Sequence, residues 1–127
     1  MNKEFIAYQG EKFTIEWYYD DKGISQAIEY FEELKKIQKA KLMTLFKKMA
    51  DIGEIRDMEK FRYEGDKIYA FKTKPDRFLC FFIKGKKIIV TNAFHKKTNK
   101  LPIVEKEKAL KCKNNYEERL KNGVYYG

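Results

Sequence analysis

Three short strand-like runs follow one another in the middle of this sequence, and they limit the folds that are open to it. They span residues 68–73, 77–83 and 87–94 and are rich in β-branched and aromatic residues. Only the turns at 74–76 and 84–86 separate them, and such short connections join antiparallel neighbours. The pattern predicts a three-stranded antiparallel meander. Its middle run is apolar on both faces and should be the central strand.

The segment before the meander carries one strand pattern and then helical ones. Residues 13–19 favour a strand. Ser25 is suited to cap a helix whose apolar residues recur at helical spacing over 24–34. A second helical stripe covers 42–49 and ends at Gly53. A break within 35–38 would give a helical hairpin. Since no Gly or Pro marks that break, one long helix is the alternative.

The remaining segments complete an expected α+β order. Residues 54–66 are polar and should be irregular. Pro102 suits the first turn of a helix that runs to about Leu120. Its apolar stripe is weak, so it should dock lightly, and Tyr125 and Tyr126 should form a frayed tail. We predict an N-terminal strand, a two-helix hairpin, the meander and a C-terminal helix, with the helices on one sheet face. The length predicts a single domain, 1–127.

Positive charge is concentrated in and around the meander. Residues 71–100 carry nine basic side chains against one acidic side chain, Asp76, in a chain of net charge +9. A focused basic surface indicates a polyanion partner, most often nucleic acid. No apolar run approaches the roughly 18 residues of a membrane span, so we expect a cytoplasmic protein with no membrane partner. Cys80, Cys112 and His95 have no metal-ligand spacing, so neither a metal nor another cofactor is expected.

The meander should gather cations around the one histidine. The start of the second run and the end of the third should meet, which makes Arg77 and His95 neighbours with Lys72 beside them. Such a cluster suits RNA cleavage without metal, because an imidazole can transfer protons and a guanidinium can bind phosphate oxygens. A lone surface histidine with solvated lysines is the plainer alternative. The predicted catalytic residues are Arg77, His95 and Lys72, and the predicted RNA-binding residues are Lys74, Lys96, Lys97 and Lys100.

Three segments of the chain resemble the RelE/ParE toxin superfamily, most closely its HigB-like, phage-derived branch. Residues 94–102 resemble that branch's F-x-K-K-T-x-K-x-P signature. Residues 77–82 are similar to its R-x-x-Y/F-F strand, and 68–72 to its aromatic-Glu-Leu-Arg strand. The resemblance implies a RelE-like fold. It also implies the toxin of a type II toxin–antitoxin system, a ribosome-dependent mRNA endonuclease that a helix-turn-helix antitoxin neutralises.

The resemblance also implies roles for single residues. It matches Lys72 to a strand arginine and Arg77 to a strand-start arginine of the family, and Lys96 and Lys97 to its paired basic residues. Ala70 stands where the family commonly has Glu, and His95 fills a variable position. Two alternatives to the nuclease stay open. One is a ParE-like gyrase inhibitor, and the other is a non-enzymatic phage or mobile-element module that binds nucleic acid or a host protein.

Overall fold

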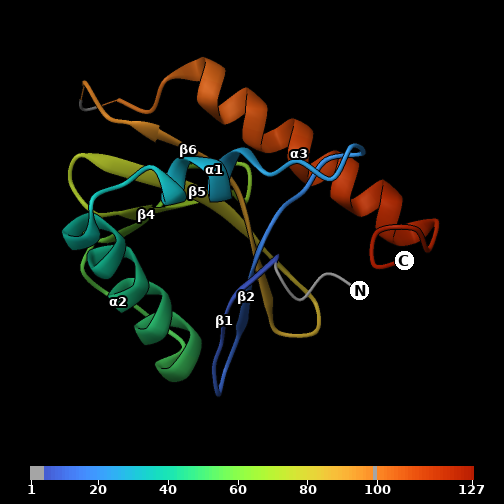
Figure 1. Ribbon diagram of the computed structural model, residues 1–127, viewed down its shortest axis with the longest axis horizontal. Coiled ribbons are helices and arrows are strands. Elements are labelled where there is room, and N and C mark those ends of the chain that lie inside the picture. The colour runs from blue at the N-terminus through green and yellow to red at the C-terminus, as the bar shows by residue number, and fades with distance from the viewer. Residues whose placement is uncertain (1–4, 99) are drawn as a thin grey trace.

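The computed structural model describes residues 5–98 and 100–127, which form six strands and three helices (Figure 1). The strands are β1 (Ile6–Gln9), β2 (Thr14–Trp17), β3 (Phe61–Tyr63), β4 (Tyr69–Lys72), β5 (Asp76–Ile83) and β6 (Lys87–His95). The helices are α1 (Gln26–Glu32), α2 (Lys36–Ile52) and α3 (Ile103–Lys121). The predicted α+β class is confirmed.

All six strands join one mixed sheet in the order β1-β2-β6-β5-β4-β3. Only β2 and β6 pair in parallel among them, and β4, β5 and β6 form the predicted antiparallel meander. The strand count differs from the prediction because β1 and β3 are additional. The prediction of irregular structure over 54–66 is wrong at β3. This strand is too short to show a clear alternation, and it is fixed by its pairing with β4, in which Phe61 lies opposite Phe71.

The two-helix hairpin between β2 and β3 is confirmed, and the alternative of one long helix is excluded. Ser25 caps α1, where its hydroxyl accepts a hydrogen bond from the backbone N–H of Ile28 at 3.3 Å. The extended backbone of Lys35 separates α1 from α2. Gly53 ends α2 in the left-handed region, with φ of +95°, a conformation that glycine adopts without steric cost.

Helices cover both faces of the sheet, so the prediction that they share one face is wrong. Phe78 and Cys80 of β5 point to the α1 and α2 side, whereas Leu79 and Phe81 point to the α3 side. A central strand that is apolar on both faces needs cover on both, and α3 supplies the second layer. Figure 1 shows α3 running along the sheet away from α2.

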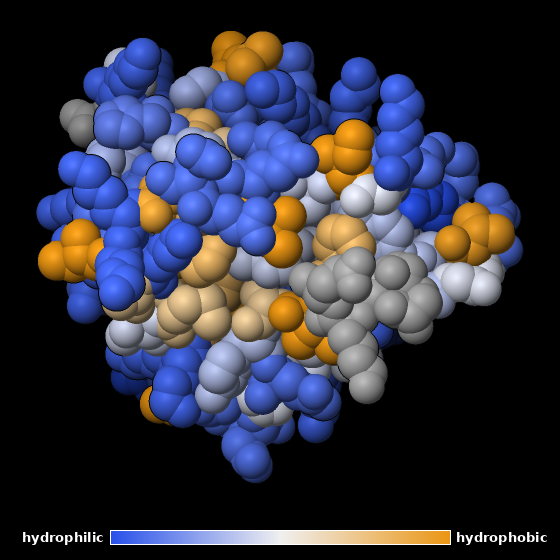
Figure 2. Space-filling view, in the orientation of Figure 1, coloured by the Kyte–Doolittle hydropathy of each residue, from blue (hydrophilic) through white to orange (hydrophobic). Residues whose placement is uncertain are grey.

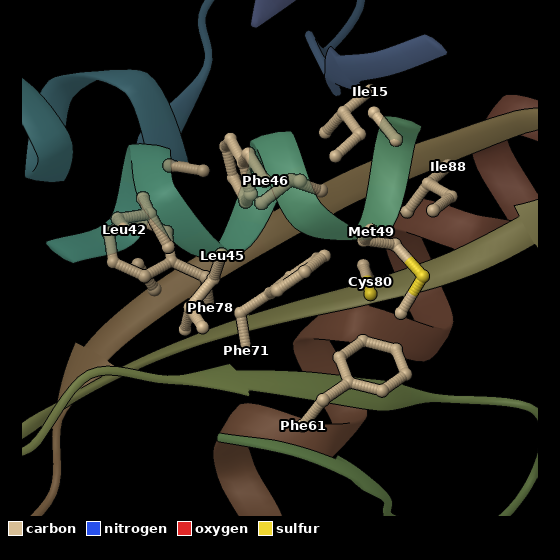
Figure 3. Close-up of a cluster of buried hydrophobic side chains, with 14 of the residues drawn as sticks. Ile15, Leu42, Leu45, Phe46, Met49, Phe61, Phe71, Phe78, Cys80 and Ile88 are labelled. Atoms are coloured by element: carbon tan, nitrogen blue, oxygen red, sulfur yellow. The ribbon is translucent and has the colours of Figure 1, made fainter. Parts of the chain in front are cut away.

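The larger core lies between α2 and the sheet. Leu42, Leu45, Phe46 and Met49 of α2 are buried against it, as the helical stripe predicts. Figure 3 shows these side chains facing apolar residues of the strands. The rings of Phe46 and Phe71 meet edge to face, with centroids 4.8 Å apart. This contact helps to set the distance between α2 and the end of β4.

The C-terminal segment packs tightly, so the predictions of light docking and a frayed tail are both wrong. Tyr116 of α3 is fully buried and Tyr125 is only 2% exposed. The Tyr125 ring stacks on that of Tyr19 with centroids 4.2 Å apart, and its hydroxyl accepts a hydrogen bond from the backbone N–H of Tyr19. The tail supplies the apolar partner that the weak stripe of α3 lacks, and it thereby fastens the helix to the sheet.

The surface is mostly hydrophilic. Figure 2 shows polar side chains over most of one face, with apolar side chains scattered among them and a paler band across the middle. Single exposed apolar residues such as Ile37, Met58 and Ile103 are ordinary for a folded domain. None of the described helices combines the length and the apolar character that crossing a membrane requires.

Candidate nucleic-acid cleft

A polar cleft of about 270 Å³ opens on the α3 face, at the end of the sheet where β4 stops and β5 starts. The pairing register explains its lining. Ala70 lies opposite Arg62, Lys72 opposite Arg77, and Arg77 opposite Phe94, so these side chains project to the same face. Neighbouring segments complete the lining with Glu59, Glu64, Lys96, Lys100 and Leu101.

Arg77 is the most deeply buried cation of the cleft. Its residue is 6% exposed, and its Nη1 donates a hydrogen bond to the backbone oxygen of Asp76 at 3.0 Å. No carboxylate of the described residues forms an ion pair with it. Burial lowers the pKa of the Arg77 guanidinium from its ordinary value, and the nearby charges of Glu64 and Glu59 partly offset that effect. A guanidinium remains charged under such a shift, so a fixed positive charge faces the cleft.

Lys72 lies directly across from Arg77 and is buried to a similar degree. Its Nζ donates a hydrogen bond to the backbone oxygen of Met58 at 2.9 Å. Burial lowers the pKa of the Lys72 ammonium, and the charge of Arg77 lowers it further. Two like charges that are held close together without an ion pair lower the stability of the fold. Residues with a purely structural role are seldom arranged in this way. An anionic ligand would neutralise both.

Two carboxylates and one further cation line the cleft beyond the predicted residues. Arg62 comes from β3, and Glu59 and Glu64 flank that strand. The Glu59 carboxylate lies 3.8 Å from the ammonium of Lys74, and both side chains are exposed. These residues were not predicted, because the polar segment 54–66 was expected to be irregular. Three residues are too few for an alternation signal, so only the pairing of β3 with β4 reveals the position of Arg62.

His95 does not share the face of Arg77, which corrects the prediction that the two converge. In the sheet His95 pairs with Asp76, whereas Arg77 pairs with Phe94. Asp76 accepts a hydrogen bond from the Tyr30 hydroxyl of α1 at 2.5 Å, so this pair faces the opposite side of the sheet. The two backbones are neighbours as predicted, but an offset of one residue reverses the face in a pleated strand. The exposed imidazole therefore lies outside the cleft lining.

The other predicted cations divide between two places. Lys96 and Lys100 line the cleft itself. Lys74 and Lys97 line a shallow hollow of about 410 Å³ beside it, which also reaches Arg77 and Lys96. The backbone N–H of Lys96 donates to the oxygen of Pro75 at 2.8 Å and ties the loop after β6 to the β4–β5 turn. All seven predicted site residues thus lie at one end of the sheet, and six of them border the two hollows.

The part of the chain that forms the cleft matches a known family. The model of the phage-derived protein Gp49-like family (DUF891) matches residues 29–114, about two thirds of the chain. The chain belongs to this family. No curated protein matches the chain. The Gp49-like family is part of the RelE/HigB-like toxin superfamily, so the resemblance seen in the sequence is supported at that level.

The segment that matches the Gp49-like family model contains the whole cleft. All of its lining residues, from Glu59 to Leu101, lie inside the matched segment. The tyrosines that fasten α3, Tyr19 and Tyr125, lie outside it. Within the described residues, no three His, Cys, Asp or Glu side chains gather closely enough to hold a metal ion. The residues of the cleft thus offer cations, two carboxylates and a lysine whose pKa is lowered.

Proposed function

We propose that this Gp49-like protein is the toxin of a type II toxin–antitoxin system and cleaves mRNA on the ribosome without metal. The observation that carries the proposal is the pair of buried cations, Lys72 and Arg77, which face a cleft and form no ion pair with any described residue. The family match supports the same conclusion at the level of the superfamily. The partners would be the ribosome with its mRNA in the cytoplasm and a helix-turn-helix antitoxin.

The proposed reaction uses the 2′-hydroxyl of the RNA as the nucleophile. The 2′-oxygen forms a bond to the adjacent phosphorus while the bond from phosphorus to the 5′-oxygen breaks. Arg77 stabilises the charge that develops on the phosphate oxygens, and Lys72 gives a proton to the leaving oxygen. The proton of the 2′-hydroxyl passes to Glu59 or Glu64. The products are a 2′,3′-cyclic phosphate and a 5′-hydroxyl.

The role first expected of His95 has no place in this scheme. Its imidazole belongs to the opposite face of the sheet and does not line the cleft. Lys96 and Lys100 line the cleft and would bind flanking phosphates. The lowered pKa of Lys72 suits proton transfer better than that of an ordinary lysine, because a proton donor works best when its pKa lies near the working pH.

The decisive experiment maps transcript ends after the protein is induced in a bacterium and again on purified ribosomes. New ends should appear with the wild type and be about 100- to 1000-fold rarer with Arg77→Gln, since loss of a group that stabilises transition-state charge costs this much. Arg56→Gln is the control, because this arginine is exposed and outside the cleft. An Arg77→Gln variant that still cut mRNA would contradict the assignment. A DNA-damage response with intact transcripts would instead indicate a gyrase inhibitor.

A further inference from the structure

Another hollow, of about 550 Å³, adjoins the cleft around the end of β4 and is separate from the shallow hollow of about 410 Å³ described above. It lies between α2 and the segments that flank β3 and β4, and it shares Glu59 and Lys72 with the cleft. Its volume is about twice that of the cleft, which is more than a single phosphate group needs. The cleft lies on the α3 face and this hollow lies beside α2, so a strand that occupies both must pass around the end of β4, where Glu59 and Lys72 border the two spaces.

The lining of this hollow combines apolar surface with two kinds of polar group. Leu45 of α2 and the methylene stems of the lysines provide apolar contact. The ammonium groups of Lys41, Lys60 and Lys74 belong to exposed residues around it and supply positive charge. The hollow thus offers an apolar wall and a cationic rim to one ligand.

The wall holds two polar groups with unused hydrogen-bonding capacity, one exposed and one buried. Asp57 accepts a hydrogen bond from the backbone N–H of Glu59 through Oδ1, which leaves Oδ2 without a partner among the described residues. Thr73 is 7% exposed, and its Oγ1 has no hydrogen-bond partner in the same part of the chain. The exposed Asp57 carboxylate can accept hydrogen bonds from the amino and ring N–H groups of a nucleobase, whereas it would repel a bare phosphate.

We propose that this hollow binds one nucleotide of the RNA strand that occupies the cleft, next to the bond that is cut. The proposal rests on the proposed function and adds a binding site to it. The base lies against Leu45 and the Thr73 wall, and its phosphate meets Lys41 and Lys60. Lys72 then contacts the strand from both hollows, at the point where the scissile phosphate passes from one to the other.

The test measures binding of uncleavable RNA, so that it is separate from catalysis. Dinucleotides and tetranucleotides with 2′-O-methyl riboses lack the nucleophile and are titrated by fluorescence anisotropy. The wild type should bind the tetranucleotide at least about tenfold more tightly than the dinucleotide, since further phosphates and a further base are engaged. The Lys41→Gln/Lys60→Gln variant should lose this gain. Its slope of log affinity against log salt should fall by about 1.4, because each single-strand phosphate contact contributes about 0.7.

A double variant on α2, the helix that carries Lys41, provides the matched control. Lys36 and Lys48 are exposed on α2 and do not line the hollow, so Lys36→Gln/Lys48→Gln removes the same charge elsewhere. The control should keep the gain from the longer RNA. An equal loss in both double variants would mean that only net charge matters, and it would overturn the nucleotide site.

The remaining outcomes separate this site from the nuclease itself. Cleavage of mRNA on ribosomes with no gain from the longer oligonucleotide overturns the nucleotide site and leaves the proposed function intact. A wild type that neither cuts mRNA on ribosomes nor binds any of the oligonucleotides overturns both. A Lys41→Gln/Lys60→Gln variant that binds every RNA normally but escapes its antitoxin would assign the hollow to a protein partner and overturn the proposal.

Discussion

The buried charges at the two ends of strand β6 differ in the partners that they have. At its first residue, Lys87 forms an ion pair of 3.2 Å with the buried carboxylate of Glu16, which also accepts a hydrogen bond from the Tyr126 hydroxyl at 2.6 Å. We call this the tyrosine end. At the cleft end, beside Phe94, the buried cations Lys72 and Arg77 form hydrogen bonds only to backbone oxygens within residues 5–98 and 100–127. At the tyrosine end the buried charge is neutralised by an ion pair. At the cleft end the buried positive charges are available to an anionic ligand.

This difference separates a structural role of burial from a functional one. A buried carboxylate with a cation and a hydroxyl beside it loses little by leaving water. Two buried cations that face each other lose solvation and also repel, so the fold bears a cost at the cleft end. Such local costs concentrate where a ligand binds, because the ligand supplies the missing countercharge. The four predictions that follow test whether the two ends really differ in this way.

The largest expected effect is on folding, at the tyrosine end. Tyr125→Ala should lower the free energy of unfolding by about 3–5 kcal/mol, as loss of a fully buried aromatic ring does. Urea denaturation measures the change. Tyr63→Ala is the control, because Tyr63 is 54% exposed on the edge strand β3 and its ring meets that of Tyr69 at a tilt, so its loss should cost less than about 1.5 kcal/mol. Equal losses in the two variants would show that the tail does not hold α3.

The tail also shows where reasoning from sequence stops. Two tyrosines after a polar helix carry no periodic signal, so nothing local predicts that Tyr125 stacks on Tyr19 more than a hundred positions away. By contrast, β4, β5, β6 and both helices of the hairpin follow from alternation, helical spacing and the caps at Ser25 and Gly53. Local patterns predict elements, whereas long-range packing decides which termini are ordered.

The candidate site was predictable in position and less so in detail. The meander brings Lys72 and Arg77 together because the three-residue connection 73–75 sets their register. The same geometry brings the His95 backbone close, but the face of a strand residue depends on an offset of one position, which the sequence did not fix. Arg62 was missed because β3 has only three residues and takes its place by pairing with β4.

The second prediction concerns alkaline pH, to which the two ends should respond with opposite signs. Burial raises the pKa of Tyr116 to about 12 and raises that of Tyr125 well above its ordinary value. Unfolded tyrosine has a pKa near 10, so the unfolded chain loses these protons first. The stabilisation is full below about pH 10 and should fall above it by about 1.4 kcal/mol per pH unit for each tyrosine.

At the cleft end the sign of the pH effect is reversed. The folded pKa of Lys72 is lowered, so the unfolded chain keeps that proton longer and stability rises as pH passes the lowered value. Urea titrations at several pH values from 8 to 11 measure both effects. Tyr125→Phe should flatten the loss above pH 10, and Lys72→Met should remove the rise in stability that comes before it. A pH profile that neither variant alters would remove the claim that these groups titrate differently on folding.

The third prediction compares the two ends directly through one kind of substitution. Lys87→Met leaves the Glu16 carboxylate with Tyr126 alone, and it should cost about 1–2 kcal/mol, since Lys87 is one third exposed. Lys72→Met removes one of two repelling buried charges and should leave stability unchanged or raise it by about 1 kcal/mol. Denaturation with urea gives both values, and the mapping of transcript ends should show loss of cleavage only for Lys72→Met. A destabilised Lys72→Met variant would make Lys72 a structural residue.

The smallest expected effect concerns hydroxyl groups. Thr73 and Thr91 are both buried, but Thr91 donates a hydrogen bond to the oxygen of Leu79 or Asn92, whereas the Thr73 hydroxyl has no partner among the described residues. Valine has nearly the same shape, so Thr73→Val should raise the free energy of unfolding by about 1 kcal/mol, and Thr91→Val should lower it by about as much. The two variants differ only in whether the lost hydroxyl was bonded. If Thr73→Val were destabilising, that hydroxyl would already be satisfied, and the cleft end would hold no unmet polar group beyond its two cations.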